Sequence, residues 1–194
     1  SVNVSTKWDG APAIFAGTDP SDGQFFVAKK SVFNKNPILY KKESDIDVTG
    51  DLGEKFKVAL KEFSKLDIKG VLQGDLLYTS LDSGIADHWT FQPNTIMYAV
   101  PTDSDIGKKI AKSKIGIVWH TTYSGDTLED MTATFGVSQP LKRVSTVWHT
   151  DASYKDVSGS AKMTAAETTK VTGDLSEAGG TLRKINSKKM GEWN

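Results

Sequence analysis

Apolar residues occur along this chain in short runs separated by polar turns. Where they recur at every second position they predict strands, because successive side chains of a strand point to opposite faces of its sheet. Gly, Pro, Asn and Asp, which favour turns, bound several of these runs. The predicted strands are Val2–Gly10, Ala11–Ala16, Gln24–Ser31, Gly70–Tyr78, Asn94–Pro101, Lys114–Tyr123 and Val144–Asp151.

Apolar spacing of three and four residues predicts helices between these strands. It is clearest over Asp51–Leu66, and Asp103–Lys112 and Thr127–Phe135 are predicted as short helices. Helical spacing returns over Thr164–Ile185. The polar stretches Val32–Val48 and Asp82–Gln92 are predicted as loops, and His88 as a surface residue.

Length and composition narrow the classes of protein. A chain of 194 residues can build one domain with a proper core. Its 24 basic and 24 acidic residues balance, so only a local basic face could attract nucleic acid. There is no cysteine, no signal peptide and no apolar run long enough to span a bilayer. These features predict a soluble, cytoplasmic protein that does not bind membranes.

The first ten residues carry the most specific chemical pattern, Lys7-Trp8-Asp9-Gly10. In a strand, Lys7 and Asp9 share a face, so an amine and a carboxylate lie side by side. A partly buried lysine beside other cations has a lowered pKa and becomes a nucleophile. An ordinary strand end with an exposed lysine is the alternative interpretation of so short a pattern.

The wider stretch Ser5–Ile14 resembles motif I of the covalent nucleotidyltransferases, the family of ATP-dependent DNA ligases, RNA ligases and mRNA capping enzymes. It is similar in particular to ligase-like proteins of tailed phages. The resemblance implies that Lys7 becomes covalently adenylylated by ATP. It also implies that the neighbouring residues Thr6, Trp8, Asp9 and Gly10 surround the nucleotide.

The strand after motif I carries a pair of lysines. In RNA ligases a basic residue there contacts the nucleotide, and Lys29 or Lys30 is similar to it. Strand alternation places the two on opposite faces, so only one is expected to enter the site. The alternative is a solvated pair on an edge strand.

Gly74-Asp75 lies in the middle of an apolar strand, and an isolated buried carboxylate needs a cation, a metal or hydrogen-bond donors. The pair resembles the Gly-Glu motif of ligases, which implies that Asp75 contacts the ribose or Mg²⁺. Pairing with a core lysine is the structural alternative. On a later strand Trp119, His120 and Tyr123 resemble the aromatic position that ligases place against adenine. Trp119 and His120 cannot both face the pocket.

Two ligase motifs are missing from the chain. It has no Glu-Gly-x-Val-x-Lys and no Lys-x-Lys strand, and Pro12 stands where DNA ligases often have arginine. Either these motifs lie downstream of Asn194 or the chain is a divergent member. We favour the first explanation, with residues 1–194 forming a single nucleotidyltransferase domain that is incomplete at one or both ends.

The resemblance implies an α+β fold, a ligase-type adenylyltransferase domain of antiparallel sheets flanked by helices. It implies an ATP-dependent polynucleotide ligase that uses Mg²⁺ and joins 5′-phosphate and 3′-hydroxyl ends of DNA or RNA. We expect a monomer. Two alternatives remain: a non-catalytic protein that binds nucleotide or nucleic acid on a degenerate ligase fold, and a structural or interaction domain of a phage.

Overall fold

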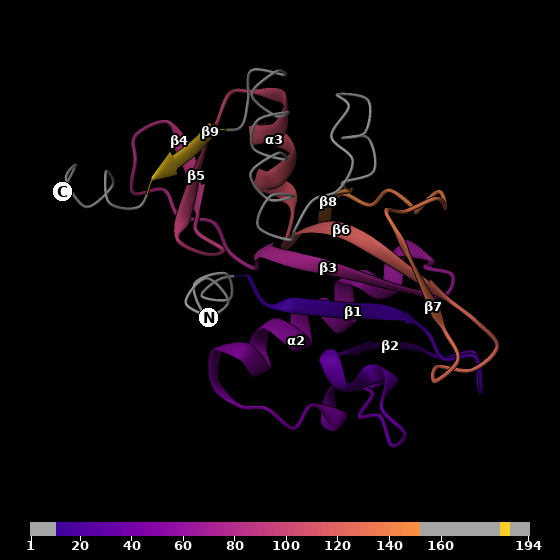
Figure 1. Ribbon diagram of the computed structural model, residues 1–194. Coiled ribbons are helices and arrows are strands. Elements are labelled where there is room, and N and C mark those ends of the chain that lie inside the picture. The colour runs from indigo at the N-terminus through magenta and orange to yellow at the C-terminus, as the bar shows by residue number, and fades with distance from the viewer. Residues whose placement is uncertain (1–10, 152–182, 187–194) are drawn as a thin grey trace.

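The fold combines two β-sheets with two α-helices over residues 11–151 and 183–186, which a computed structural model describes (Figure 1). The predicted strand Val2–Gly10 lies outside these residues. The strands are β1 (Ala13–Thr18), β2 (Phe25–Ala28), β3 (Val71–Tyr78), β4 (His88–Phe91), β5 (Ile96–Pro101), β6 (Ile115–Ser124), β7 (Thr132–Phe135), β8 (Val147–Asp151) and β9 (Arg183–Asn186). The helices are α2 (Gly50–Phe63) and α3 (Asp105–Lys112), with short 3₁₀ turns η1 (Lys30–Phe33), η2 (Glu43–Asp45) and η3 (Ser64–Leu66).

The larger sheet has the order β2-β1-β3-β6-β7, and all of these neighbours are antiparallel. β8 also joins β6, and this pair is parallel. The smaller sheet, β4-β5-β9, is antiparallel throughout. The fold is therefore α+β with predominantly antiparallel sheets, as the sequence predicts, and the parallel β6–β8 pair is an addition to that prediction.

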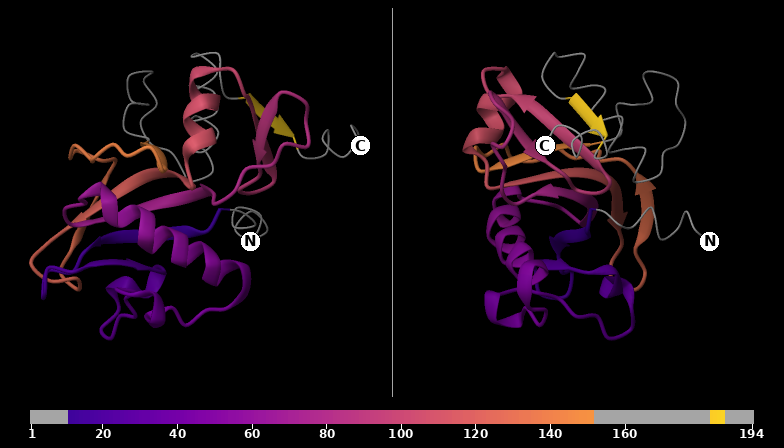
Figure 2. Two further views of the ribbon diagram at one scale, coloured as in Figure 1. Left: turned by 180° about the vertical axis from the view of Figure 1, so that it is seen from behind. Right: turned by 90° about the vertical axis from the view of Figure 1, so that its left-hand side faces the viewer.

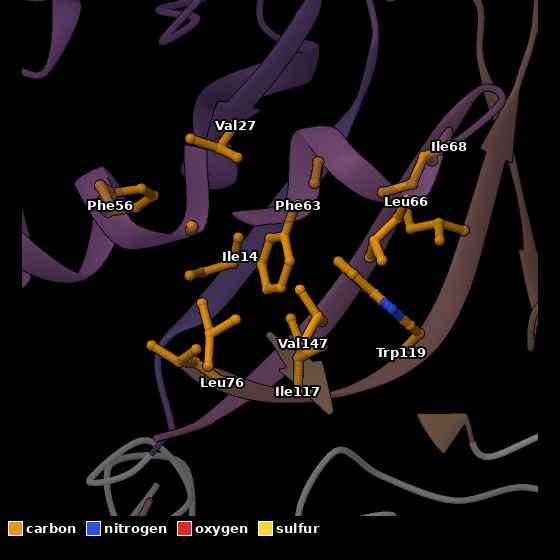
Figure 3. Packing of buried hydrophobic residues seen from close by; sticks show 14 of the residues in the cluster. Ile14, Val27, Phe56, Phe63, Leu66, Ile68, Leu76, Ile117, Trp119 and Val147 are labelled. Carbon is orange, nitrogen blue, oxygen red and sulfur yellow. The ribbon is translucent and has the colours of Figure 1, made fainter. Parts of the chain in front are cut away.

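Helix α2 covers one face of the larger sheet. Phe56, Ala59 and Phe63 repeat at helical spacing and are buried, because they point toward the sheet. They meet Ile14 from β1, Leu72 and Leu76 from β3, Ile117 and Trp119 from β6, and Val147 from β8 (Figure 3). This cluster is the main core of the protein.

The other face of the larger sheet carries two separate apolar clusters. At one end Leu77, Tyr78 and Val118 pack with Phe91, Tyr98, Val100 and Ile110, which come from the smaller sheet and α3. At the other end Phe15, Phe26, Ala28, Val32 and Val71 pack together. In Figure 1 and Figure 2 (left) α2 lies beside β1 and β2, and α3 lies toward the end of the larger sheet that holds β6 and β8. Between the two clusters this face is polar.

Most predicted elements are confirmed, with bounds shifted by a few residues. Two predictions are wrong. The predicted loop Asp82–Gln92 contains β4, and the predicted helix Thr127–Phe135 contains β7. The predicted helical segment Thr164–Ile185 lies outside the described residues except at its end, which belongs to β9. In each case a partner strand supplies the hydrogen bonds: β5 for β4 and β9, and β6 for β7. Pairing with another strand outweighs local spacing.

Neither α-helix in the described ranges is long and apolar enough to cross a membrane.

Replacing Gly74 by Ala should lower the free energy of unfolding by about 1–3 kcal/mol, since overpacking a filled core forces its neighbours to move. A Cβ atom at Gly74 would lie 2.6 Å from the carbonyl oxygen of Val118 and 2.8 Å from the Trp119 ring. Urea denaturation measures the change. Gly84→Ala is the matched control, because a Cβ there meets no atom within 4 Å. Equal stability of the two variants would contradict this packing.

Because His149 is buried, we expect the free energy of unfolding to depend on pH. Burial, reinforced by the positive charge of Arg143, lowers the pKa of His149 to about 4. The unfolded chain therefore binds a proton below pH 6.5 that the folded chain takes up only near pH 4, and stability falls as pH decreases through this window. Between pH 6.5 and pH 5 the wild type should lose about 2 kcal/mol of unfolding free energy through His149, and His149→Gln should not show this loss. Urea denaturation of both proteins at the two pH values measures the losses. Equal losses would refute the prediction.

Candidate functional site

A β-bulge in β6 lies at His120, beside Asp75. Gln73 of β3 pairs with Thr121, but the next residue, Gly74, pairs with Trp119, so His120 is the extra residue. A bulge of this kind often occurs beside an active site. His120 points away from the face of Trp119, and its Nε2 lies 3.5 Å from Oδ1 of Asp75. The extra residue places Tyr123 on this face as well.

Asp75 is a buried carboxylate that lacks a full set of partners. It is 5% exposed, at the centre of β3 between β1 and β6. His120 is its ion-pair contact among the described residues, and Oδ2 accepts no hydrogen bond. Leaving a buried acceptor unsatisfied typically costs 1–3 kcal/mol or more, because the group has lost its water. Such a group is therefore a candidate for binding a cation or a hydrogen-bond donor.

The imidazole of His120 is held in place from its other side. Its Nδ1 lies 2.8 Å from Oγ1 of Thr121, and its backbone oxygen accepts a hydrogen bond from the Gly136 amide. Nε2 has no hydrogen-bond partner that meets the usual geometry. The ring thus presents this nitrogen to Oδ1 of Asp75, whereas Oδ2 is the carboxylate oxygen that has no partner among the described residues.

A polar and aromatic surface continues from Asp75 along the same face. Gln73, two residues before Asp75, accepts a 2.6 Å hydrogen bond from the Tyr123 hydroxyl. The Tyr123 ring packs against Phe33 and Phe15, with centroid distances of 4.4 and 5.9 Å. We refer to Asp75, His120, Gln73 and Tyr123 as the β3–β6 site.

The alternation of β3 explains why this site interrupts an apolar face. Val71, Gln73, Asp75 and Leu77 point to the same side of the sheet. Val71 belongs to one apolar cluster and Leu77 to the other, so Gln73 and Asp75 lie between the clusters. Gln73 is not among the predicted site residues, although its two-residue spacing from Asp75 is the signal that reveals it.

The structure separates Trp119 from this site. Trp119 is 1% exposed and packs among the α2 residues, with its ring centroid 5.1 Å from that of Phe63. It therefore faces the main core, on the opposite side of the sheet from Asp75 (Figure 3). Of the two residues that cannot share a face, His120 is the one at the site. Gly74 leaves room for the Trp119 ring, which gives this glycine a packing role.

The lysine pair also lies differently from its prediction. β2 ends at Ala28, so Lys29 and Lys30 are not strand residues and the alternation argument does not apply to them. Lys29 is half-buried, and its charge helps to hold the pKa of Asp47 low, after the larger effect of the Tyr40 hydrogen bond. Lys30 is exposed at the start of η1. Neither forms an ion pair with Asp75 within the described ranges.

The motif I residues Thr6, Lys7, Trp8, Asp9 and Gly10 lie outside the described residues. The structure does show where the chain continues after them. Ala13, the first residue of β1, is the antiparallel partner of Asp75 and is exposed. Motif I therefore leads directly into the strand that borders the β3–β6 site.

The carboxylate of Asp75 suits a magnesium ion that takes its other ligands from a substrate and water. Mg²⁺ in phosphoryl-transfer sites takes one or two carboxylates together with water and phosphate oxygens. Asp75 offers one carboxylate with a free oxygen. The described residues contain no cluster of three or more His, Asp or Glu side chains that could hold a metal unaided. Any ion here would thus depend on the ligand for most of its coordination.

Comparison with known proteins gives one match. The family described as "Family of unknown function (DUF6267)" matches residues 1–192 of the chain. No curated protein and no solved structure matches it.

Asp75→Asn should leave the free energy of unfolding unchanged or raise it by up to about 1 kcal/mol, because the amide keeps the shape and removes a charge that lacks partners. Asp19→Asn is the matched control at another buried carboxylate. Ser21 and Lys41 donate hydrogen bonds of 2.8–2.9 Å to Asp19 and, against the effect of burial, hold its pKa below the usual value.

The control substitution should cost about 1–3 kcal/mol, since it breaks charge-assisted hydrogen bonds. Urea denaturation of both variants provides the comparison. A larger loss for Asp75→Asn than for Asp19→Asn would show that Asp75 has a structural role.

Proposed function

The chain belongs to the DUF6267 family, and we propose that it is an ATP-dependent polynucleotide ligase, built on a ligase-type adenylyltransferase domain. In this proposal it joins a 5′-phosphate to a 3′-hydroxyl of DNA or RNA. The proposal combines the motif Lys7-x-Asp9-Gly10 with the unsatisfied carboxylate of Asp75.

The pairing of Ala13 with Asp75 is the observation that carries the proposal. Lys7 precedes Ala13 by six residues, and a six-residue segment spans at most about 20 Å. The nucleophile is therefore tethered to the strand that borders the buried acid. A covalent nucleotidyltransferase needs this proximity, because the lysine and the groups that bind the nucleotide act on one phosphate.

Adenylylation would use the neutral amine of Lys7. Its nitrogen forms a bond to the α-phosphorus of ATP, the bond from that phosphorus to the pyrophosphate oxygen breaks, and the amine loses a proton. AMP then passes from Lys7 to the oxygen of a 5′-phosphate. In the last step a 3′-hydroxyl attacks that phosphate and releases AMP. Positioning and charge stabilisation are the protein's main contributions to such steps.

Asp75, His120 and Tyr123 of the β3–β6 site have defined tasks in this scheme. Asp75 would bind Mg²⁺ or a ribose hydroxyl through its free oxygen, and Asp9 would orient Lys7 or the ribose. His120 and Tyr123 would offer aromatic rings to the adenine, the task that the buried Trp119 cannot perform. Thr6, Trp8 and Gly10 would line the nucleotide. Lys29 or Lys30 would contact the phosphates of the nucleotide from beyond the end of β2.

Incubation with ATP and Mg²⁺ should add one adenylyl group to the chain, and intact-mass spectrometry detects it. Lys7→Ala should abolish the addition, because the nucleophile is gone. Lys35→Ala, another lysine substitution, serves as the control and should be labelled like the wild type. Asp75→Asn should label at least about tenfold more slowly, a loss of roughly 1.4 kcal/mol of transition-state stabilisation.

Full labelling of Lys7→Ala would refute the assignment of the nucleophile. Saturable ATP binding by the wild type without any mass increase would refute the ligase and favour the non-catalytic nucleotide-binding alternative. The missing Glu-Gly-x-Val-x-Lys and Lys-x-Lys motifs are the feature that favours this alternative.

A further inference from the structure

A basic cleft lies between helix α3 and the segment that leads into β8. It has a volume of about 410 Å³, and its lining includes Lys108, Lys109, Lys112 and Arg143. The lysines occupy the last five residues of α3. Val144, Val147 and Trp148 form the apolar part of the lining. The cleft thus combines four cationic side chains with an aromatic ring.

Within the described part of the chain, the lysines of this cleft lack the acidic partners that several other lysines have. Lys41, Lys55, Lys57, Lys65 and Lys69 each form an ion pair with Asp or Glu. Lys108, Lys109 and Lys112 form none with any residue in the described part of the chain. The chain has no net charge, so this concentration of unpaired cations is a local feature. It creates a positive potential at the cleft.

Arg143 and His149 connect the cleft to the sheet. Nη1 of Arg143 donates a 3.4 Å hydrogen bond to the backbone oxygen of His149. His149 is 7% exposed, lines the cleft, and its Nε2 has no hydrogen-bond partner among the residues that the structure describes. The cleft therefore contains an unsatisfied buried polar atom in addition to its surface cations, a feature that points to a ligand.

The lining matches the chemistry of a polynucleotide better than that of a simple anion. Lys108 and Lys112 are one helical turn apart, so their Cβ atoms lie about 5–6 Å from each other and both side chains can reach phosphates of one strand. An arginine adds a planar donor for a phosphate. An indole ring beside cations is the usual combination for a single strand, because bases stack on aromatic rings. Inorganic phosphate would leave Trp148 and the two valines without a partner.

We propose that this cleft binds the sugar-phosphate backbone of a single polynucleotide strand, with Trp148 available to a sugar or base. The assignment deepens the proposed ligase function and rests on it for the identity of the polyanion. β8 pairs with β6, and β6 also carries His120 of the β3–β6 site. One sheet therefore links the cleft to the residues assigned to the nucleotide.

Fluorescence anisotropy with a fluorescein-labelled, 5′-phosphorylated single-stranded oligonucleotide tests the cleft. The variant Lys108→Ala/Lys109→Ala/Lys112→Ala should bind at least about tenfold more weakly than the wild type. Its affinity should also depend less on salt: the slope of log K against log salt should fall by about 2 when three phosphate contacts to a single strand are lost. Arg143→Gln should weaken binding in the same direction.

The control removes the same charge from another helix. Lys55→Ala/Lys57→Ala/Lys61→Ala changes three lysines of α2, none of which lines the cleft, and should bind the oligonucleotide like the wild type. Thermal unfolding verifies that both triple variants are folded. Equal affinity of the two triple variants would overturn the proposal. Equally tight binding of polyglutamate, or displacement of the oligonucleotide by an equal concentration of inorganic phosphate, would also overturn it.

Self-adenylylation of the wild-type chain is measured separately, without oligonucleotide. If the oligonucleotide binds through the α3 lysines but no adenylyl group is added, the ligase proposal fails and the cleft assignment stands. If the chain is adenylylated but the α3 lysines make no difference to oligonucleotide binding, the cleft assignment fails and the ligase proposal stands.

Discussion

The antiparallel pairing of β3 with both β1 and β6 determines where the residues of the β3–β6 site lie. On its α2 side, β3 contributes Leu72 and Leu76 to the main core. On the other side it carries Gln73 and Asp75, between two apolar clusters. The bulge at His120 belongs to the same pairing, because one extra residue in β6 lets Tyr123 share a face with His120 and Gln73 while Trp119 remains in the core. Neither Trp119 nor His120 could hold its position if the register moved by one residue.

The buried carboxylates of this protein differ in the hydrogen-bond and ion-pair partners that they have. Glu62 is as deeply buried as Asp75, and its Oε2 likewise has no hydrogen-bond partner among the described residues. Burial alone would raise its pKa, but Lys65 binds Oε1 at 2.7 Å and, with Thr146, holds the pKa below its usual value. Asp19 is satisfied by Lys41 and Ser21. Asp75 has a histidine at 3.5 Å and, among the described residues, an oxygen without a partner. An acid with so few partners destabilises the fold, and a bound cation or hydroxyl would offset this.

The distribution of positive charge follows the division of the fold into two faces. On the side of α2 and the β1–β2 hairpin, lysines are paired with carboxylates within the same or neighbouring elements. On the side of α3, three lysines and Arg143 surround a cleft. A chain with balanced charge can thus still present a localised attraction to a polyanion, since the field near a surface depends on nearby unpaired groups rather than on the total. The proposed ligase requires two binding regions, one for ATP and one for a strand, and β6 borders both.

The sequence by itself determined the order of the elements and the residues of highest chemical interest. Periodicity located α2, α3 and the strands β1, β2, β3, β5, β6 and β8. Each of these elements buries one face, and the spacing of its apolar residues shows that face in the sequence. An acid inside an apolar strand identified Asp75 for the same reason. Only the tertiary structure decided which partner each strand takes and where a bulge lies. For that reason β4, β7 and β9 escaped prediction, and so did the choice of His120 over Trp119 and the basic cleft between α3 and β8. These features depend on pairing and packing with other segments of the chain, and the spacing within each segment carries no information about them.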